Sequence, residues 1–145
     1  MTENKKIKTN SWKAWLLATR PKTLAGAAVP VMIGVALALR TTGWQHFRFV
    51  PAILCFLFAF LMQVDSNLIN DYFDFRHGND DPATRLGPKR ACSEGWITPR
   101  AMVAGLALVS VLACAVGLPL VWYGGWQMII VGAACVLFAF LYTTF

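Results

Sequence analysis

The chain has 145 residues, of which 57% are hydrophobic and only 14% are charged. This apolar share exceeds that of ordinary soluble domains, so the composition excludes a typical soluble protein and predicts an all-α integral membrane protein. The net charge of +6 does not indicate nucleic-acid binding, because the basic residues flank apolar segments and membrane topology accounts for them there.

The first 22 residues form a polar N-terminal segment before the predicted membrane domain, residues 23–145. Residues 1–10 are polar and are expected to be disordered. Ser11 can cap a short helix, from Trp12 to Thr19, whose two tryptophans suit the membrane interface. The tetrapeptide Arg20-Pro-Lys-Thr then ends this helix. Its basic residues, Arg20 and Lys22, either anchor the first span or take part in a functional site.

Four apolar segments predict a polytopic membrane helix bundle. They run from about Thr23 to Leu39, from about Val50 into a polar motif, from about Ala101 to Trp122, and from about Trp126 to Phe145. Thr98 and Pro99 look like the cap and first turn of the third span, which should bend or end near Pro119. The last span ends without a polar flank or a cap, so we expect the C-terminal part of the domain to be missing.

The polar motif that ends the second span is Asn67-Leu-Ile-Asn-Asp-Tyr-Phe-Asp. With roughly 100° per residue, one helix face carries its amides and carboxylates. They are Asn67, Asn70, Asp71 and Asp74. Two carboxylates one turn apart with amide oxygens suit Mg²⁺. The alternative is a helix end that merely meets water, which requires no one-sided stripe. Asp65 lies roughly opposite Asn67 and should pair with another span or subunit.

A long polar loop, residues 76–98, follows the motif, and loops of this length are usually functional or disordered. Its charged side chains are first acidic and then basic: Asp80 and Asp81, then Arg85, Lys89 and Arg90. Carboxylate side chains can hold a metal cation, and the basic side chains that follow them can hold phosphate, so this order suits a ligand made of a metal ion and a diphosphate. For the basic residues, an ordinary solvated loop is the alternative.

Lysine and arginine are distributed unequally along the chain. Six of these basic residues precede the first span, two lie between the first and second spans, five lie between the second and third spans, and none lies between the third and fourth spans. The positive-inside rule therefore places the N-terminus and the acidic loop in the cytoplasm, at the cell (inner) membrane. Cys92 in this loop should then react with an impermeant thiol reagent only from the cytoplasmic side. None of the four cysteines forms a C-x-x-C pair, so a disulfide framework or zinc site is not predicted.

Several motifs resemble those of the intramembrane aromatic prenyltransferases of the UbiA type, over about residues 15–145. They are Arg20-Pro-Lys-Thr before a Gly/Ala-rich span, Asn67-x-x-Asn-Asp-Tyr-Phe-Asp, Gly78-x-Asp and Arg85-Leu-Gly-Pro-Lys-Arg. The last run is most similar to the branch that prenylates 1,4-dihydroxy-2-naphthoate in menaquinone synthesis. The resemblance implies a bundle of about nine membrane helices, with two Asp-rich motifs facing one cavity.

The resemblance also implies a reaction. A polyprenyl chain moves from its diphosphate to 1,4-dihydroxy-2-naphthoate, with release of diphosphate and CO₂, and gives demethylmenaquinol. On this analogy Mg²⁺–diphosphate is held by Asn67, Asp71 and Asp74, joined by Asp80 or Asp81. The substrates are further bound by Arg20, Lys22, Asn70, Arg85, Lys89 and Arg90.

This chain departs from the family pattern because about four spans leave no second Asp-rich motif. We therefore expect the 145 residues alone not to be a working enzyme, unless a homo-oligomer rebuilds the cavity. Prenyl transfer to another aromatic acceptor, such as 4-hydroxybenzoate, stays open. A non-enzymatic Mg²⁺-binding membrane subunit also stays open, whereas the spacing typical of phosphatidyl-group transferases is missing.

Overall fold

The computed structural model describes residues 7–78 and 89–144, with side chains up to residue 141. Within this part, all regular elements are helical. They are α1 (Trp12–Ala18), a 3-10 turn η1 (Pro21–Thr23), α2 (Leu24–Thr42), α3 (Phe49–His77), α4 (Pro99–Gly124) and α5 (Gln127–Thr144). The predicted all-α class is confirmed, and each predicted span coincides with one long helix.

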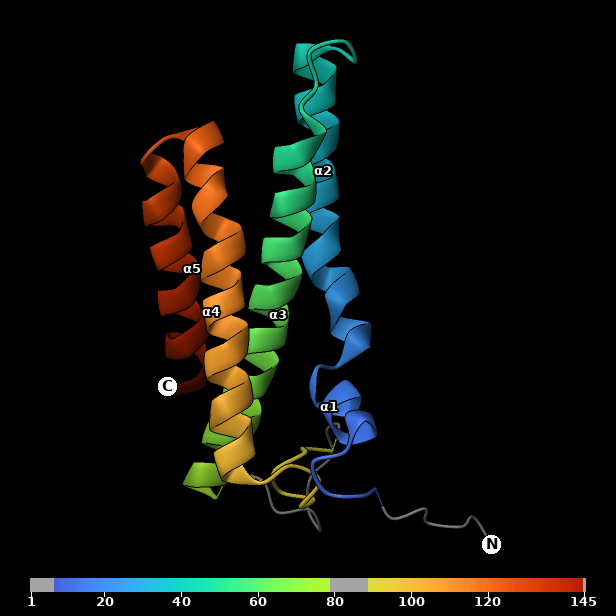
Figure 1. Cartoon of the computed structure of the whole chain (residues 1–145), viewed down its shortest axis with the longest axis vertical. Coiled ribbons are helices and arrows are strands. Elements are labelled where there is room, and N and C mark those ends of the chain that lie inside the picture. The colour runs from blue at the N-terminus through green and yellow to red at the C-terminus, as the bar shows by residue number, and fades with distance from the viewer. Residues whose placement is uncertain (1–6, 79–88, 145) are drawn as a thin grey trace, which may run out of the picture.

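The four long helices run side by side, each antiparallel to its neighbour in sequence (Figure 1). Helix α3 is central, because it contacts α2, α4 and α5. The short α1 lies at the end of the bundle where α3 finishes and α4 begins (Figure 1). This arrangement brings the polar end of α3 close to the N-terminal segment and to the residues that lead into α4.

The bundle has the properties of an integral membrane protein. By length and composition, three helical stretches of the described chain can cross a membrane: Trp12–Thr42, Phe49–His77 and Pro99–Gly124. A fourth apolar stretch, Gln127–Leu141, is shorter. Large apolar side chains are exposed along all four long helices, for example Ile33, Ile53, Leu108 and Ile129. Such outward-facing apolar surface is what a lipid environment requires.

The predicted helix caps are present. Ser11 Oγ accepts a hydrogen bond from the backbone N–H of Ala14 (3.3 Å), and Thr98 Oγ1 accepts one from Ala101 (3.3 Å). Pro119, however, does not end the third span, since α4 continues through it to Gly124. Proline removes a single backbone donor, and surrounding groups in a membrane helix bundle can accommodate that loss.

The start of the described chain is bonded to the segment before α4. The backbone N–H of Asn10 donates to Trp96 O (2.8 Å), and Thr9 Oγ1 donates to Gly95 O (3.1 Å). The expectation of disorder is therefore wrong for Thr9 and Asn10, because these bonds join segments far apart in sequence. A small buried core forms beside them, from Ala14, Ala18, Leu68, Ala91, Cys92, Ile97 and Met102.

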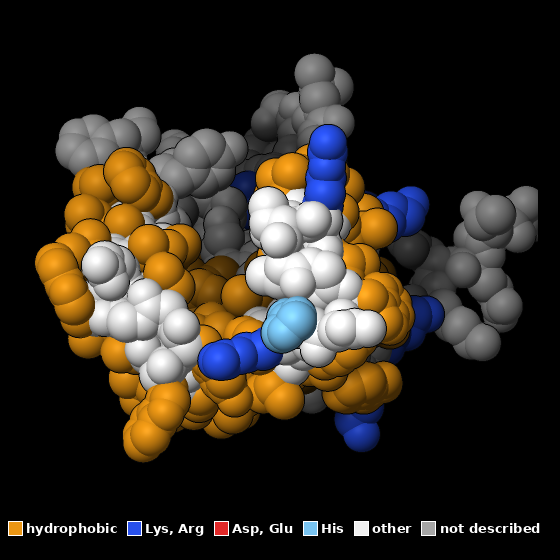
Figure 2. All heavy atoms as spheres, turned by 90° about the horizontal axis from the view of Figure 1, so that it is seen from above, with side chains coloured by type: hydrophobic (Ala, Val, Ile, Leu, Met, Phe, Trp, Pro, Cys, Tyr) orange, Lys and Arg blue, Asp and Glu red, His pale blue; other side chains and the backbone are white. Residues whose placement is uncertain are grey.

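The two ends of the bundle differ in chemistry. Figure 2 looks onto the end opposite α1, where hydrophobic side chains surround a histidine and a few basic side chains. No acidic side chain of the described residues is visible on that face (Figure 2). The carboxylates at the C-terminal end of α3 thus lie at the other end, beside α1 and the start of α4.

Candidate active site

The polar motif lies on one continuous helix. Since α3 extends from Phe49 to His77, the spacing of Asn67, Asp71 and Asp74 places them on one face, one turn after another. Asn67 and Asp71 are buried, whereas Asn70 and Asp74 are partly exposed. The same helical face is therefore divided between enclosed and accessible polar groups.

Asp71 is the most enclosed polar residue of the motif, with 1% of its surface exposed. Its Oδ2 accepts a hydrogen bond from the backbone N–H of Ala91 (2.8 Å), and its Oδ1 accepts one from Cys92 (2.9 Å). Hydrogen bonds to a charged acceptor contribute about 1.5–3 kcal/mol each. This carboxylate thus fixes the segment before α4 against the end of α3.

Asn67 makes a similar connection to the N-terminal segment. Its Nδ2 donates to the backbone oxygen of Thr19 (3.0 Å) and to Thr23 Oγ1 (2.9 Å). Thr23 belongs to the Arg20-Pro-Lys-Thr tetrapeptide, so the structure brings together two motifs that are 44 residues apart. The roles of Thr19 and Thr23 were not predicted, because a single sequence does not show which carbonyl or hydroxyl meets a distant amide.

Asp74 and Arg90 form an ion pair. The Arg90 side chain is 9% exposed and the Asp74 side chain is 25% exposed, so the pair lies at the edge of the buried region. The acidic motif and the basic part of the following loop are thus in contact. Lys89 instead pairs with Glu94 (3.2 Å), and its side chain is largely exposed, where an ion pair contributes little.

Arg20 has an unusual backbone conformation. Its φ is +50°, in the left-handed region that non-glycine residues rarely adopt. Its carbonyl oxygen accepts hydrogen bonds from the backbone N–H and the Oγ1 of Thr23, both at 2.9 Å. Such strain persists only where surrounding contacts impose it, and it is common at functional sites. Lys22, in the same turn, is exposed.

Three residues proposed for the site, Asp80, Asp81 and Arg85, lie outside the described residues. Their roles stay predictions.

Cys92 is buried, with 4% of its surface exposed. Burial raises the pKa of its thiol to about 12, and the charge and hydrogen bonding of Asp71 act in the same direction. A protonated, enclosed thiol reacts slowly, because the thiolate is the nucleophile. Cys92 is therefore a poor probe of membrane sidedness, and the predicted orientation stays a prediction.

Asp65 pairs with another span, as its position on the helix predicts. It is 1% exposed, and Ser110 Oγ of α4 donates to its Oδ1 (3.0 Å) and Oδ2 (3.2 Å). Polar groups within a membrane bundle usually face another helix and pair there. This contact joins α3 to α4 on the side away from Asn67.

The polar face of α3 fits a divalent cation that receives further ligands from its substrate. The described residues contain no group of three His, Cys, Asp or Glu side chains close enough to hold a metal ion alone. Asp74 is accessible, and the carbonyl oxygens of Asn67 and Asn70 are hard donors on the same face. One or two carboxylates plus phosphate oxygens form the usual environment of Mg²⁺.

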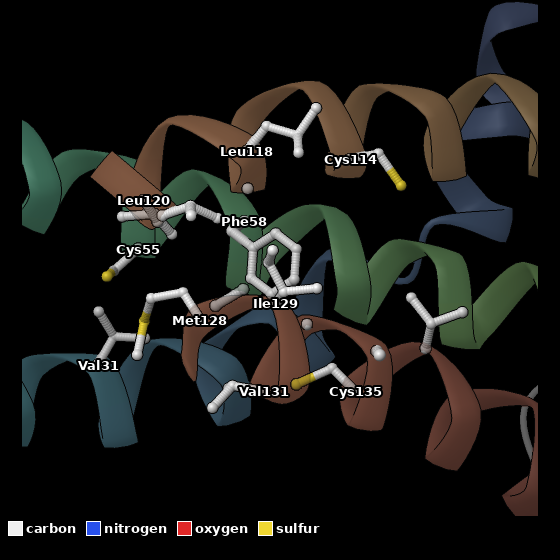
Figure 3. Close-up of a pocket in the computed structure, with 16 residues that line it drawn as sticks. Val31, Cys55, Phe58, Cys114, Leu118, Leu120, Met128, Ile129, Val131 and Cys135 are labelled. Atoms are coloured by element: carbon white, nitrogen blue, oxygen red, sulfur yellow. The ribbon is translucent and has the colours of Figure 1, made fainter. Parts of the chain in front are cut away.

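An apolar cavity of about 480 Å³ lies between the long helices. It is lined by side chains from α2 to α5, among them Val31, Phe58, Leu118, Ile129 and Cys135 (Figure 3). Phe58 is 13 residues before Asp71 on α3, roughly 20 Å along the helix axis. The cavity is thus separate from the polar end and is suited to an apolar ligand.

Known proteins resemble this chain over most of its length. The sequence profile of the UbiA prenyltransferase family matches residues 27–145. A 1,4-dihydroxy-2-naphthoate octaprenyltransferase of Escherichia coli (strain K12) is 43% identical over 122 residues, which are 83% of this chain and 37% of that protein. One of Mycobacterium tuberculosis is 33% identical over 134 residues, 92% of this chain and 44% of that protein.

A more distant relative is the UbiA prenyltransferase domain-containing protein 1 homolog of Drosophila melanogaster. It is 32% identical over 123 residues, which are 78% of this chain and 34% of that protein. No solved structure matches the chain. The chain spans less than half the length of these relatives. With its profile match over residues 27–145 and its membrane helix bundle, the chain belongs to the UbiA prenyltransferase family.

Proposed function

We propose that this chain is part of an enzyme that transfers a polyprenyl chain from its diphosphate to 1,4-dihydroxy-2-naphthoate. Diphosphate and CO₂ leave, and demethylmenaquinol is the product. The observation that carries the proposal is the contact between Asp74 and Arg90 at the polar end of α3. It joins a carboxylate that can hold a cation to a guanidinium that can hold phosphate. Family membership and the activity named for the relatives also support the proposal.

In this proposal, Arg90 contacts the diphosphate through its guanidinium group. Arginine forms directional, charge-assisted hydrogen bonds with phosphate oxygens, and such bonds strengthen as the leaving group gains charge. Asp74, with the amide oxygens of Asn67 and Asn70, holds Mg²⁺ against the same diphosphate. A bound Mg²⁺ supplies positive charge that stabilises the leaving diphosphate.

The remaining predicted residues are assigned to the same substrate. Asp80 or Asp81 completes the metal ligands, and Arg20, Lys22, Arg85 and Lys89 contribute positive charge around the diphosphate. The sequence also places Asp71 in the ligand set, but both of its oxygens accept backbone hydrogen bonds, so the proposed set omits it. The polar end of α3 faces the cytoplasm, where Mg²⁺ and soluble phosphorylated compounds are found.

The apolar cavity suits the prenyl tail. Its lining is almost entirely hydrocarbon and sulfur, so it can hold the apolar end of the tail while the diphosphate stays at the polar end of α3. The electron-rich naphthoate ring attacks the carbon that the diphosphate leaves. The attacked ring carbon gives up its proton, and a proton replaces the carboxylate on the ring when CO₂ leaves, so no net proton is lost from the ring.

A chimaera tests the proposal without requiring that this chain act alone. The matched segment of the Escherichia coli relative is replaced by this chain, and membranes are assayed with Mg²⁺, octaprenyl diphosphate and 1,4-dihydroxy-2-naphthoate. Prenylated naphthoate product is expected, and the same chimaera with Asp74→Asn should lose it. Product from 4-hydroxybenzoate but not from the naphthoate would overturn the acceptor assignment.

A further inference from the structure

The two buried polar residues of the motif, Asn67 and Asp71, are hydrogen-bonded to neighbouring segments of the chain, which suggests a role other than ligand binding. Both oxygens of Asp71 accept hydrogen bonds from consecutive backbone N–H groups, those of Ala91 and Cys92. Asp71 is 1% exposed, whereas a quarter of the Asp74 side chain is accessible. A metal ion that approached Asp71 would have to compete with these bonds or displace the segment.

Arg90 immediately precedes the two N–H groups that Asp71 binds. Fixing the backbone at Ala91 and Cys92 therefore fixes where the Arg90 side chain begins. Asp71 and Asp74 are three residues apart, roughly 4.5 Å along the helix, so consecutive residues of the segment meet consecutive turns of α3. The geometry links the Asp71 carboxylate to the placement of the Arg90 guanidinium on Asp74.

Asn67, one turn earlier, acts on the other basic segment. Its amide N–H₂ group donates to Thr19 O and Thr23 Oγ1, on both sides of Arg20. The residue types match their partners, since Asn67 faces acceptors and needs a donor, whereas Asp71 faces two donors and needs a carboxylate. Exchanging the two types would place donor against donor at one position and acceptor against acceptor at the other.

We propose that Asn67 and Asp71 are positioning residues that anchor the segments carrying Arg20 and Arg90 to α3, and that Asp71 is not a metal ligand. The proposal rests on the proposed function, because it assigns the cation to Asp74 and the phosphate contacts to the anchored arginines. Asp71 acts on the reaction through Arg90. Its loss should disturb the segment before α4 even when no metal or substrate is present.

The test uses Cys92 as a reporter, in the full chain in lipid nanodiscs with Cys55, Cys114 and Cys135 replaced by alanine. The rate of alkylation by N-ethylmaleimide is measured without metal. Asp71→Asn puts an amide N–H₂ against a backbone N–H, so the segment should open. Because loss of the Asp71 charge by itself lowers the pKa of Cys92, rates are measured over a range of pH and compared as rate constants of the thiolate, which should rise at least about tenfold. Glu94→Gln is the matched control, because it removes a carboxylate from the same segment whose ion-pair partner, Lys89, is largely exposed, and its rate should stay within about twofold.

A second measurement separates this proposal from the proposed function. Mn²⁺ binding in the presence of inorganic diphosphate is followed by electron paramagnetic resonance. Asp74→Asn should abolish the bound signal. Asp71→Asn should still give the signal of bound Mn²⁺, but at a higher diphosphate concentration than the parent protein requires. Unchanged alkylation in Asp71→Asn, with Mn²⁺ binding lost at all diphosphate concentrations, would make Asp71 a ligand and overturn the positioning role.

If Asp71→Asn loses the helix content of the parent protein, Asn67→Asp tests the other anchor. Its carboxylate faces two acceptors, so hydrogen exchange in residues 19–23 should accelerate while residues 89–98 stay protected. Exchange unchanged in residues 19–23 would overturn the role of Asn67. Neither readout requires turnover, so failure of the proposed reaction and failure of the positioning role are observed separately.

Discussion

The contact between Asp65 and Ser110 leads to a quantitative prediction for the stability of the helix bundle. Ser110→Ala removes the hydroxyl that donates to both carboxylate oxygens of Asp65, which is 1% exposed. Leaving a buried acceptor unsatisfied costs about 1–3 kcal/mol. Interhelical hydrogen bonds measured in membrane proteins average about 0.6 and reach about 1.7 kcal/mol. Because both oxygens lose their partner, we expect a loss of about 1–2 kcal/mol.

The decisive comparison is a double-mutant cycle. Asp65→Ala in the Ser110→Ala background removes the unsatisfied carboxyl group, so the double variant should be more stable than Ser110→Ala alone. The coupling free energy should be about 1 kcal/mol or more. Ser66→Ala is the matched control, because Ser66 neighbours Asp65 on α3 and is half-buried. It should change stability by less than about 0.5 kcal/mol.

The assay is reversible unfolding of the full chain in mixed micelles with increasing sodium dodecyl sulfate. Energy transfer between dyes on α3 and α4 reports separation of the two helices. Additive effects of the two single variants, with a coupling below about 0.3 kcal/mol, would refute the reasoning. In that case Asp65 would be stabilised by groups other than Ser110.

Three further predictions concern the polar end. Arg90→Ala should weaken binding of inorganic diphosphate with Mg²⁺ at least about tenfold by calorimetry, whereas Lys89→Ala, at an exposed ion pair, should change it less than about threefold. Lys89 and Arg48 are exposed and lie at opposite ends of α3. Single cysteines at these positions should react with an impermeant thiol reagent from opposite sides of the membrane, and Lys89→Cys should react from the cytoplasm. Labelling of both from one side would contradict the topology. The pKa of Cys92 is raised to about 12, so between about pH 9 and 12 the thiol stays protonated in the folded protein but not in the unfolded chain. The segment around Cys92 should therefore lose stability, and its backbone amides should lose protection from hydrogen exchange, as the pH rises from about 9 towards 12. Constant protection would contradict this.

Apolar periodicity and cap residues were sufficient to predict the helices. The runs of apolar residues matched α2 to α5, and Ser11 and Thr98 cap their helices as their types suggest. The one-sided stripe and the pairing of Asp65 with another span were also predictable, because both follow from helical geometry. These features depend on residues close in sequence or on one helix wheel.

The division of the stripe into anchored and accessible residues could not be predicted. It depends on which backbone groups meet Asn67 and Asp71, and those groups lie 20 to 48 residues away in sequence. The burial of Cys92 and the bonding of Asn10 were missed for the same reason. A polar loop and a polar terminus look solvated in sequence, whereas Ala91 and Cys92 bond to the end of α3 and Asn10 bonds to Trp96.

The attachment of residues 9–18 has a consequence for the order of synthesis. Thr9 and Asn10 bond to residues 95–98, and Ala14 and Ala18 share a core with Met102. Residues 9–18 must therefore wait until about ninety more residues have been made before they can dock. During insertion of the first two spans, the polar end of α3 lacks its cover, and the site is assembled only when α4 begins to enter the membrane.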